Sequence, residues 1–216
     1  MTANFSDIPD VFYVFCNTAD LGCWHNLQFT HSITSAGIAA CQDAAFLKTY
    51  QDGTADYFPF VPNSGRSTGF TSFFSAALTA EYRVEYDVER IRRMEFSRAP
   101  SRFSCVFAFG ALEDCQKASQ IYRWNIQEVR RFRLVDHRLN RVARVNMDVV
   151  SLMRSGYRKG SWTEDRSIAI WRHYWSGAEG LSIDIPAVEN DRPTRRAMSV
   201  GTLWEYLIEG RLELID

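Results

Sequence analysis

The longest regular pattern in the chain is a helical one between Phe74 and Phe96. Apolar residues recur through it at helical spacing while charged residues fill the other face, and these apolar positions are Leu78, Val84, Val88, Ile91 and Met94. The pattern predicts an amphipathic helix over 74–96 that ends before Ala99-Pro100, because the residue before a proline disfavours helical backbone.

Three further segments have helical character. Residues 35–50 are rich in alanine, and residues 112–118 suit a short helix. A third helix is expected to follow Thr163, a residue type that caps helices, since Glu164 and Asp165 would occupy its first turn. Gly177 would end this helix.

Short runs rich in aromatic and β-branched residues predict the strands. They lie at 11–16, 103–109, 121–126, 181–185, 204–208 and 211–215, and residues 130–139 are a candidate to extend the sheet. The last two strands are expected to be joined by a turn around Glu209-Gly210. Turn-forming residues predict a loop at 51–69. Strands and helices mix without regular alternation and no linker divides the chain, so we expect one α+β domain over 1–216.

The net charge of -1 conceals an uneven distribution of charge along the chain. Residues 1–80, 81–160 and 161–216 carry net charges of -4, +7 and -4, and 22 of the 25 basic residues are arginine. Arginine makes bidentate contacts to phosphate and stacks on bases, so the middle segment is a candidate anion-binding region. The alternative is that Arg–Glu pairs such as Glu89 with Arg92 and Arg93 cover a solvated helix face.

The motifs of several common enzyme classes do not occur. There is no G-x-G-x-x-G, G-x-x-x-x-G-K-[ST] or H-E-x-x-H, which argues against Rossmann dehydrogenases, P-loop NTPases and zincins. The five cysteines form no C-x-x-C and the four histidines have no metal-ligand spacing, so we expect reduced thiols and no metal. No apolar run has membrane-spanning length and no secretory signal begins the chain, so we expect a cytoplasmic protein without membrane attachment.

Two segments together resemble the ADP-ribosyltransferase superfamily. Cys105-Val106-Phe107-Ala108-Phe109-Gly110, followed by a short helix, resembles the strand that helps to hold the nicotinamide end of NAD. Trp204-Glu205-Tyr206-Leu207-Ile208 is similar to the strand that presents the catalytic glutamate in the poly(ADP-ribose) polymerase and DarT-type branches. Ala99-Pro100-Ser101-Arg102 and Tyr174-Trp175-Ser176-Gly177 are similar to a bacterial family that we place in the same superfamily. The resemblance covers about half of the chain, in pieces, and implies a split, mostly antiparallel sheet with flanking helices.

The resemblance also implies that NAD is a co-substrate and that Glu205 is the catalytic residue. Cleavage of the nicotinamide–ribose bond develops positive charge on the ribose, and a fixed carboxylate that accepts a hydrogen bond from the 2′-hydroxyl stabilises that charge. Glu209 and Glu213 are the alternative carboxylates. The residues that the resemblance assigns to NAD binding are Tyr13, Val14, Phe15, Arg92, Ser101, Arg102 and Phe107.

Val14 stands where the superfamily usually has a histidine or arginine that anchors NAD. That anchor then falls to backbone groups of the first strand, to Arg102 or to His31. Phe107 stands where many relatives have tyrosine, which keeps the stacking face and loses the hydroxyl.

The loop before the glutamate strand largely sets the target in this superfamily, and the resemblance places that loop at residues 188–202. Here it carries Arg192, Arg195 and Arg196, which suit a phosphate backbone, and Leu203 replaces the Gln or Glu that guides a protein acceptor. With the basic middle segment, this favours a nucleic-acid target, RNA or DNA.

These features lead to a first hypothesis and its alternatives. The first is a bacterial or phage-associated toxin or defence enzyme that transfers ADP-ribose from NAD to a nucleic-acid base and is restrained by an antitoxin or other inhibitory protein. The second is a catalytically silent module of the same fold that binds nucleic acid or protein. Transfer to a protein target, or NAD-dependent removal of a phosphate from RNA, are the remaining alternatives.

Overall fold

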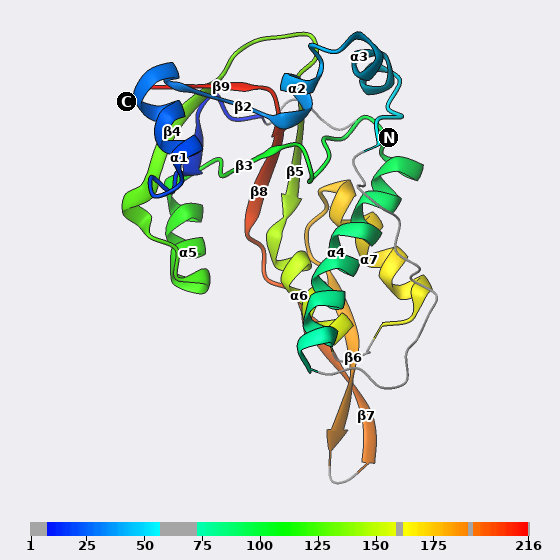
Figure 1. The fold of residues 1–216 in the computed structure, drawn as a ribbon. Helices are drawn as coiled ribbons and strands as arrows, with labels where there is room; N and C mark the ends of the chain where they lie inside the picture. The colour runs from blue at the N-terminus through cyan, green and yellow to red at the C-terminus, as the bar shows by residue number, and fades with distance from the viewer. Residues whose placement is uncertain (1–7, 57–72, 159–161, 190–191, 216) are drawn as a thin grey trace. The chain divides into compact units, whose positions relative to one another are not determined.

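The chain forms two compact units, each assembled from separate segments (Figure 1). The computed structural model describes residues 8–56, 73–158, 162–189 and 192–215. Unit 1 comprises residues 1–57, 96–145 and 203–216, and unit 2 comprises residues 58–95 and 146–202. Helices and antiparallel sheets are both present, which confirms the α+β class. The expectation of a single domain stays a prediction.

Unit 1 contains two sheets. The four-stranded sheet has the order β1 (Phe12–Phe15), β4 (Val129–Leu134), β9 (Arg211–Leu214), β2 (Ser32–Thr34). The three-stranded sheet has the order β3 (Val106–Ala108), β8 (Trp204–Glu209), β5 (Arg141–Asn146). A bridge between Tyr13 and Phe109, with two backbone hydrogen bonds of 2.8 Å, links the first strand to the end of β3.

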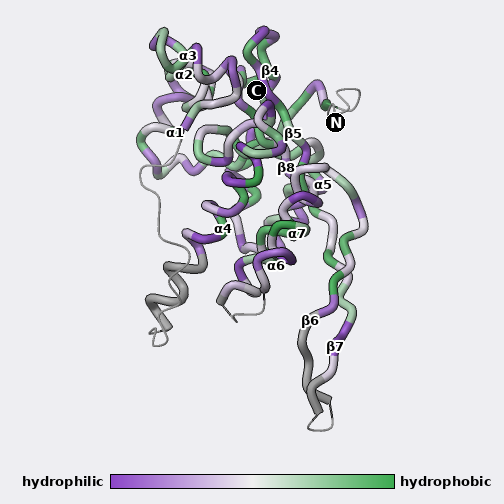
Figure 2. Tube along the Cα trace, turned by 90° about the vertical axis from the view of Figure 1, so that its right-hand side faces the viewer, coloured by the Kyte–Doolittle hydropathy of each residue, from purple (hydrophilic) through white to green (hydrophobic). Residues whose placement is uncertain are grey.

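One hydrophobic core lies between these two sheets. Its buried members come from both of them and include Phe12, Val14, Phe132, Ala108, Tyr206, Ile208 and Leu212. Figure 2 shows hydrophobic colour along the trace beside the labels β5 and β8. Because successive side chains of a strand point to opposite faces, Glu205, Leu207 and Glu209 lie on the face of β8 turned away from this core.

The helices of unit 1 are short. They are α1 (Leu21–His25), the π-helical turn η2 (Asn26–Thr30), α2 (Ala36–Ala40), α3 (Ala44–Gln51), α5 (Leu112–Tyr122) and the 3₁₀ turn η3 (Ile126–Glu128). The helical character expected over 35–50 is confirmed, in the form of two helices. They are separated at 41–43, where the Asp43 side chain accepts a hydrogen bond of 2.7 Å from the Phe46 N–H and starts the second helix.

The strand expected over 121–126 is wrong. Helix α5 continues to Tyr122 and ends at Arg123, which has left-handed backbone with φ of 60°. The strand follows later, as β4 (Val129–Leu134), so residues 130–134 of the candidate segment 130–139 lie in the sheet.

Unit 2 is built from three helices and one hairpin in the part of the chain that the structure describes. These are α4 (Phe73–Glu95), α6 (Met147–Arg158), α7 (Glu164–Ser176), β6 (Ser182–Glu189) and β7 (Arg192–Ser199). The helices pack on one another through buried residues such as Val88, Met153 and Trp171. The long helix expected over 74–96 is confirmed, as is the helix that starts after Thr163 and ends at Gly177.

Two expected connections differ from the structure. Residues 188–202, expected as a loop, contain β7, which pairs with β6 from Ser182 opposite Ser199 to Glu189 opposite Arg192. Strands β8 and β9 do not form a hairpin, because they belong to different sheets. Both backbone groups of Gly210 bond to Ser35, through Ser35 N–H at 2.9 Å and Ser35 Oγ at 3.0 Å, and the chain turns there into the second sheet.

The loop expected over 51–69 lies largely outside the described residues, which stop at 56 and resume at 73. None of the helices in the described ranges combines the length and the apolar character that a bilayer crossing requires.

Candidate functional site

Glu205 occupies the central strand of the three-stranded sheet. Its strand β8 has β3 on one side and β5 on the other, and the residue is only 4% exposed. A glutamate with a purely structural role would be expected on an edge strand with its side chain exposed. Glu205 lies on a central strand and is buried. A buried carboxylate requires a compensating partner, so its surroundings are informative.

Arg102, from the turn before β3, lies against the Glu205 carboxylate. Its Nη1 lies 3.7 Å from Glu205 Oε2, and both side chains are almost fully buried. The same guanidinium lies over the Phe107 ring, 5.0 Å from the ring centroid. Phe107 pairs with Leu207 across β3 and β8, so its ring shares the face of Glu205, and it remains 38% exposed. The structure thus brings three of the predicted site residues into one cluster.

A second buried carboxylate, Glu209, lies on the same face of β8. It is fully buried, and its Oε1 accepts a hydrogen bond of 2.5 Å from the Ser104 hydroxyl and one of 3.1 Å from the Ser101 N–H. Arg141 Nη1 lies 3.8 Å from its Oε2. The predicted site residue Ser101 therefore acts here through its backbone, and it binds Glu209.

Cys105 is set between these charged groups. Burial raises the pKa of its thiol, Arg102 opposes that rise, and the carboxylates of Glu205 and Glu209 add to it. A thiol held protonated is a poor nucleophile. Cys105 is therefore part of the structure around the cluster and not its reactive group.

The first strand places its predicted residues differently. The Val14 side chain belongs to the hydrophobic core, so it turns away from the face of Glu205. The backbone N–H and C=O of Tyr13 are both bonded to Phe109. The Phe15 ring packs edge-to-face with the rings of Phe109 and Trp124, with centroid distances of 6.0 Å and 5.2 Å.

Arg92 belongs to unit 2, where it is fully buried. Its Nε and Nη2 donate hydrogen bonds of 2.8 Å and 2.7 Å to the two carboxylate oxygens of Glu89, which is also fully buried. The interpretation of this pair as part of a solvated helix face is wrong, although Arg93 is exposed. A bidentate pair of this kind serves the packing of α4.

The three arginines predicted to bind substrate lie on β7, in unit 2. Arg195 and Arg196 are exposed, and the side chain of Arg192 lies outside the described parts. His31, the alternative NAD anchor, is exposed at the end of η2 with left-handed backbone, φ 48°.

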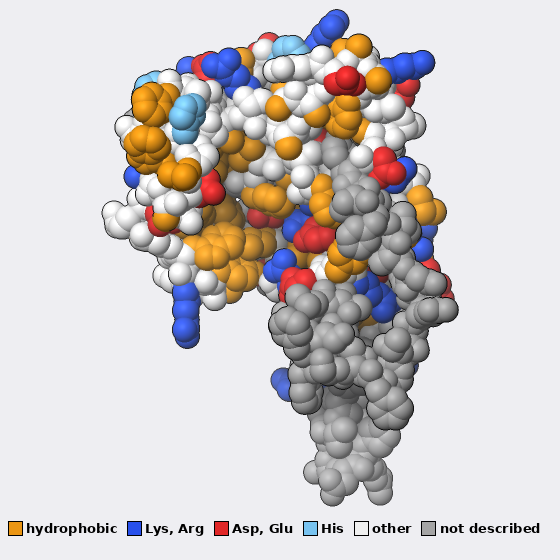
Figure 3. Space-filling view, viewed as in Figure 1, with side chains coloured by type: hydrophobic (Ala, Val, Ile, Leu, Met, Phe, Trp, Pro, Cys, Tyr) orange, Lys and Arg blue, Asp and Glu red, His pale blue; other side chains and the backbone are white. Residues whose placement is uncertain are grey.

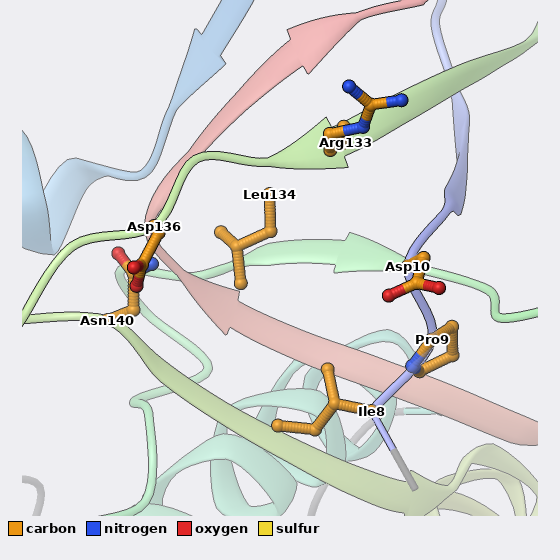
Figure 4. A pocket seen from close by; sticks show the side chains of 7 residues that line it. All are labelled: Ile8, Pro9, Asp10, Arg133, Leu134, Asp136 and Asn140. Carbon is orange, nitrogen blue, oxygen red and sulfur yellow. The ribbon is translucent and has the colours of Figure 1, made fainter.

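A pocket of about 500 Å³ lies elsewhere in unit 1 (Figure 4). Its lining combines apolar and charged residues from the start of the described chain and from the end of β4: Ile8, Pro9, Asp10, Arg133, Leu134, Asp136 and Asn140. Leu134 and Ile8 pack against the core between the two sheets, on the other side of β8 from Glu205. None of the predicted site residues lines this pocket.

Exposed aromatic side chains gather over α1, beside a histidine (Figure 3). Leu21 and Phe29 are 81% and 66% exposed, and the Phe29 ring lies 5.5 Å from Trp24 and 5.1 Å from His25. Contiguous apolar surface of this kind marks interaction sites.

Comparison with models of known protein families gives no match, and comparison with curated proteins gives none either. The cluster therefore stands on its geometry. The sequence already named Glu205, Arg102 and Phe107, and it named Glu209 only as an alternative carboxylate. The signal for Glu209 was its spacing of four from Glu205, which in a strand places both on one face.

Proposed function

We propose that the protein is an NAD-dependent ADP-ribosyltransferase whose catalytic carboxylate is Glu205. The observation that carries the proposal is the cluster on the outer face of β8, β3 and the preceding turn: a buried carboxylate, an arginine 3.7 Å away and a half-exposed aromatic ring under that arginine. These are the groups that binding and cleaving a dinucleotide requires.

Each group has a chemical role in that reaction. NAD supplies the ADP-ribosyl group and releases nicotinamide. The Glu205 carboxylate stabilises positive charge at the ribose by accepting a hydrogen bond from the 2′-hydroxyl. Arg102 can turn part of its guanidinium toward a diphosphate, and the exposed face of Phe107 can stack on a flat ring.

The fit to NAD is partial at the first strand. Val14 faces the core and the Tyr13 backbone is bonded to Phe109, so neither offers a free anchor for NAD. The anchor in this proposal falls to Arg102, the one charged alternative that lies against Glu205.

A nucleic-acid acceptor and a cytoplasmic location are parts of the same proposal. The acceptor would meet Arg195 and Arg196, whose side chains are exposed on β7. A toxin of this kind requires restraint by an inhibitory protein in its own cell.

The test is transfer of label from NAD. We expect the chain to release nicotinamide and to label RNA or DNA, and Glu205→Gln to reduce transfer about 100-fold or more, since it removes the stabilising charge. Glu213→Gln, an exposed glutamate on β9, is the matched control and should keep wild-type activity. Absence of both nicotinamide release and transfer in the wild type would refute the enzyme.

The second candidate is a silent binding module. The core position of Val14 and the aromatic surface over α1 favour it. In that case Glu205→Gln would leave binding to a partner unchanged, and no chemistry would be detected in either protein.

A further inference from the structure

The turn before β3 is a closed structure of five residues, Ser101 to Cys105. The N–H groups of Ser104 and Cys105 donate to the Ser101 carbonyl at 3.1 Å and 3.0 Å. The Phe103 N–H donates to Ser101 Oγ at 3.2 Å. These bonds converge on Ser101 and close the turn.

The turn is bonded to Glu209 through two of its residues. The carboxylate takes the Ser101 N–H at 3.1 Å and the Ser104 hydroxyl at 2.5 Å, and all three residues are buried. Helix α2 closes over the contact: a Cβ placed on Gly37 would lie 3.1 Å from Glu209 Oε1 and 3.2 Å from Ser104 Oγ. The Gly37 N–H also donates to the Ser104 carbonyl at 3.2 Å.

The other side of the same turn faces Glu205. Arg102 follows Ser101 directly, and its guanidinium meets the Glu205 carboxylate at 3.7 Å and the Phe107 ring at 5.0 Å. Glu205 and Glu209 are four residues apart on one face of β8, a separation of about 13 Å along a strand. The turn therefore bridges two carboxylates of one strand.

We propose that Glu209 is a positioning residue that clamps the 101–105 turn and thereby holds Arg102 against Glu205 and Phe107. Hydrogen bonds to a buried carboxylate are strong, and they fix the backbone at Ser101. Arg102 is the next residue, so the fixed backbone of Ser101 determines where the Arg102 side chain can reach. The effect on NAD rests on the proposed function, whereas the clamp itself does not.

The competing explanation is that Glu209 only stabilises unit 1. A stabilising residue would change the free energy of unfolding without acting through Arg102. Two measurements separate the explanations. One is hydrogen exchange in the 101–105 turn, and the other is the coupling between Ser104 and Arg102 in their effect on NAD.

The local readout is amide hydrogen exchange of the 101–105 segment in the intact chain. Ser104→Ala removes the 2.5 Å bond, and we expect exchange of this segment to rise about tenfold or more, since a hydrogen bond to a charged group is lost. Ser32→Ala is the matched control, because Ser32 is a buried serine of the same unit whose hydroxyl bonds to Thr30 and not to Glu209. Unchanged exchange at 101–105 in Ser104→Ala, or an equal rise in Ser32→Ala, overturns the clamp.

The coupling is measured by a double-mutant cycle on KM for NAD. We expect Ser104→Ala to raise KM in the wild-type background and to have no further effect in Arg102→Ala, because both act through one guanidinium. Ser32→Ala should combine additively with Arg102→Ala. An effect of Ser104→Ala that persists in Arg102→Ala overturns the proposed path. A wild type that neither binds nor turns over NAD refutes the proposed function, and the clamp is then decided by hydrogen exchange alone.

Discussion

Three glutamates on the last two strands show how surroundings set the role of one side-chain type. Glu205 is buried beside Arg102, Glu209 is buried among two serines and Arg141, and Glu213 is exposed beside Arg211 at 3.4 Å. An exposed pair contributes little to stability, whereas each buried carboxylate depends on its partner. Only the buried ones are therefore candidates for a specific function.

The same distinction gives a test at neighbouring arginines of α4. Arg92→Met should lower the free energy of unfolding by about 3 to 5 kcal/mol, because it leaves Glu89 buried without its bidentate partner. Arg93→Met, an exposed position one residue later, should change it by less than about 0.5 kcal/mol. Urea denaturation of both variants measures the difference, and equal effects would contradict a buried pair.

At the scale of the elements, two helices end in the same left-handed conformation with different residues. Helix α7 ends at Gly177 with φ of 64°, and α5 ends at Arg123 with φ of 60°. Glycine adopts this conformation without steric cost, whereas other residues do not.

This contrast predicts opposite effects of two substitutions. Gly177→Ala should destabilise the protein by about 1 kcal/mol, and Arg123→Gly should be neutral or stabilise it, since relief of strain offsets the added freedom of the unfolded chain. Denaturation midpoints measure both. A stabilising Gly177→Ala would show that the cap is not left-handed in solution.

The elements that the sequence predicted well carry complete local signals. Helix α4 has a long apolar repeat, and α7 has both of its caps, Thr163 and Gly177. The hairpin expected around Glu209-Gly210 is wrong because distant groups decide the path of the chain there. Gly210 bonds to Ser35, which lies far away in sequence, and so β8 and β9 part instead of forming a hairpin. The link between Ser104 and Glu209 is equally distant, and no local pattern indicates it.

At the scale of the whole molecule, the basic middle segment is divided between the two units. Unit 1 holds 12 basic and 14 acidic residues, and unit 2 holds 13 and 12. The excess along the sequence therefore does not make either unit strongly basic. Binding of a polyanion would depend on local groups such as Arg195 and Arg196 and not on net charge.

The salt dependence of nucleic-acid binding tests this. If β7 contacts phosphates, the double variant Arg195→Gln, Arg196→Gln should weaken binding of single-stranded RNA and reduce the slope of log K against log salt by about 1 to 2. Arg211→Gln, an exposed arginine on β9, is the control. Fluorescence anisotropy over a salt series gives the slopes, and an unchanged slope would exclude β7 as the contact.

The alternation of side chains along β8 limits how this segment can vary in length. Inserting one residue between Leu207 and Ile208 would carry either Glu205 or Glu209 to the apolar side, where Tyr206 and Ile208 now pack. Homologous chains should accordingly tolerate exchanges within this strand but no gaps. A Ser-Arg-x-Ser motif followed, toward the end of the domain, by Glu-x-x-x-Glu is thus a sequence signature with which distant homologues can be searched for.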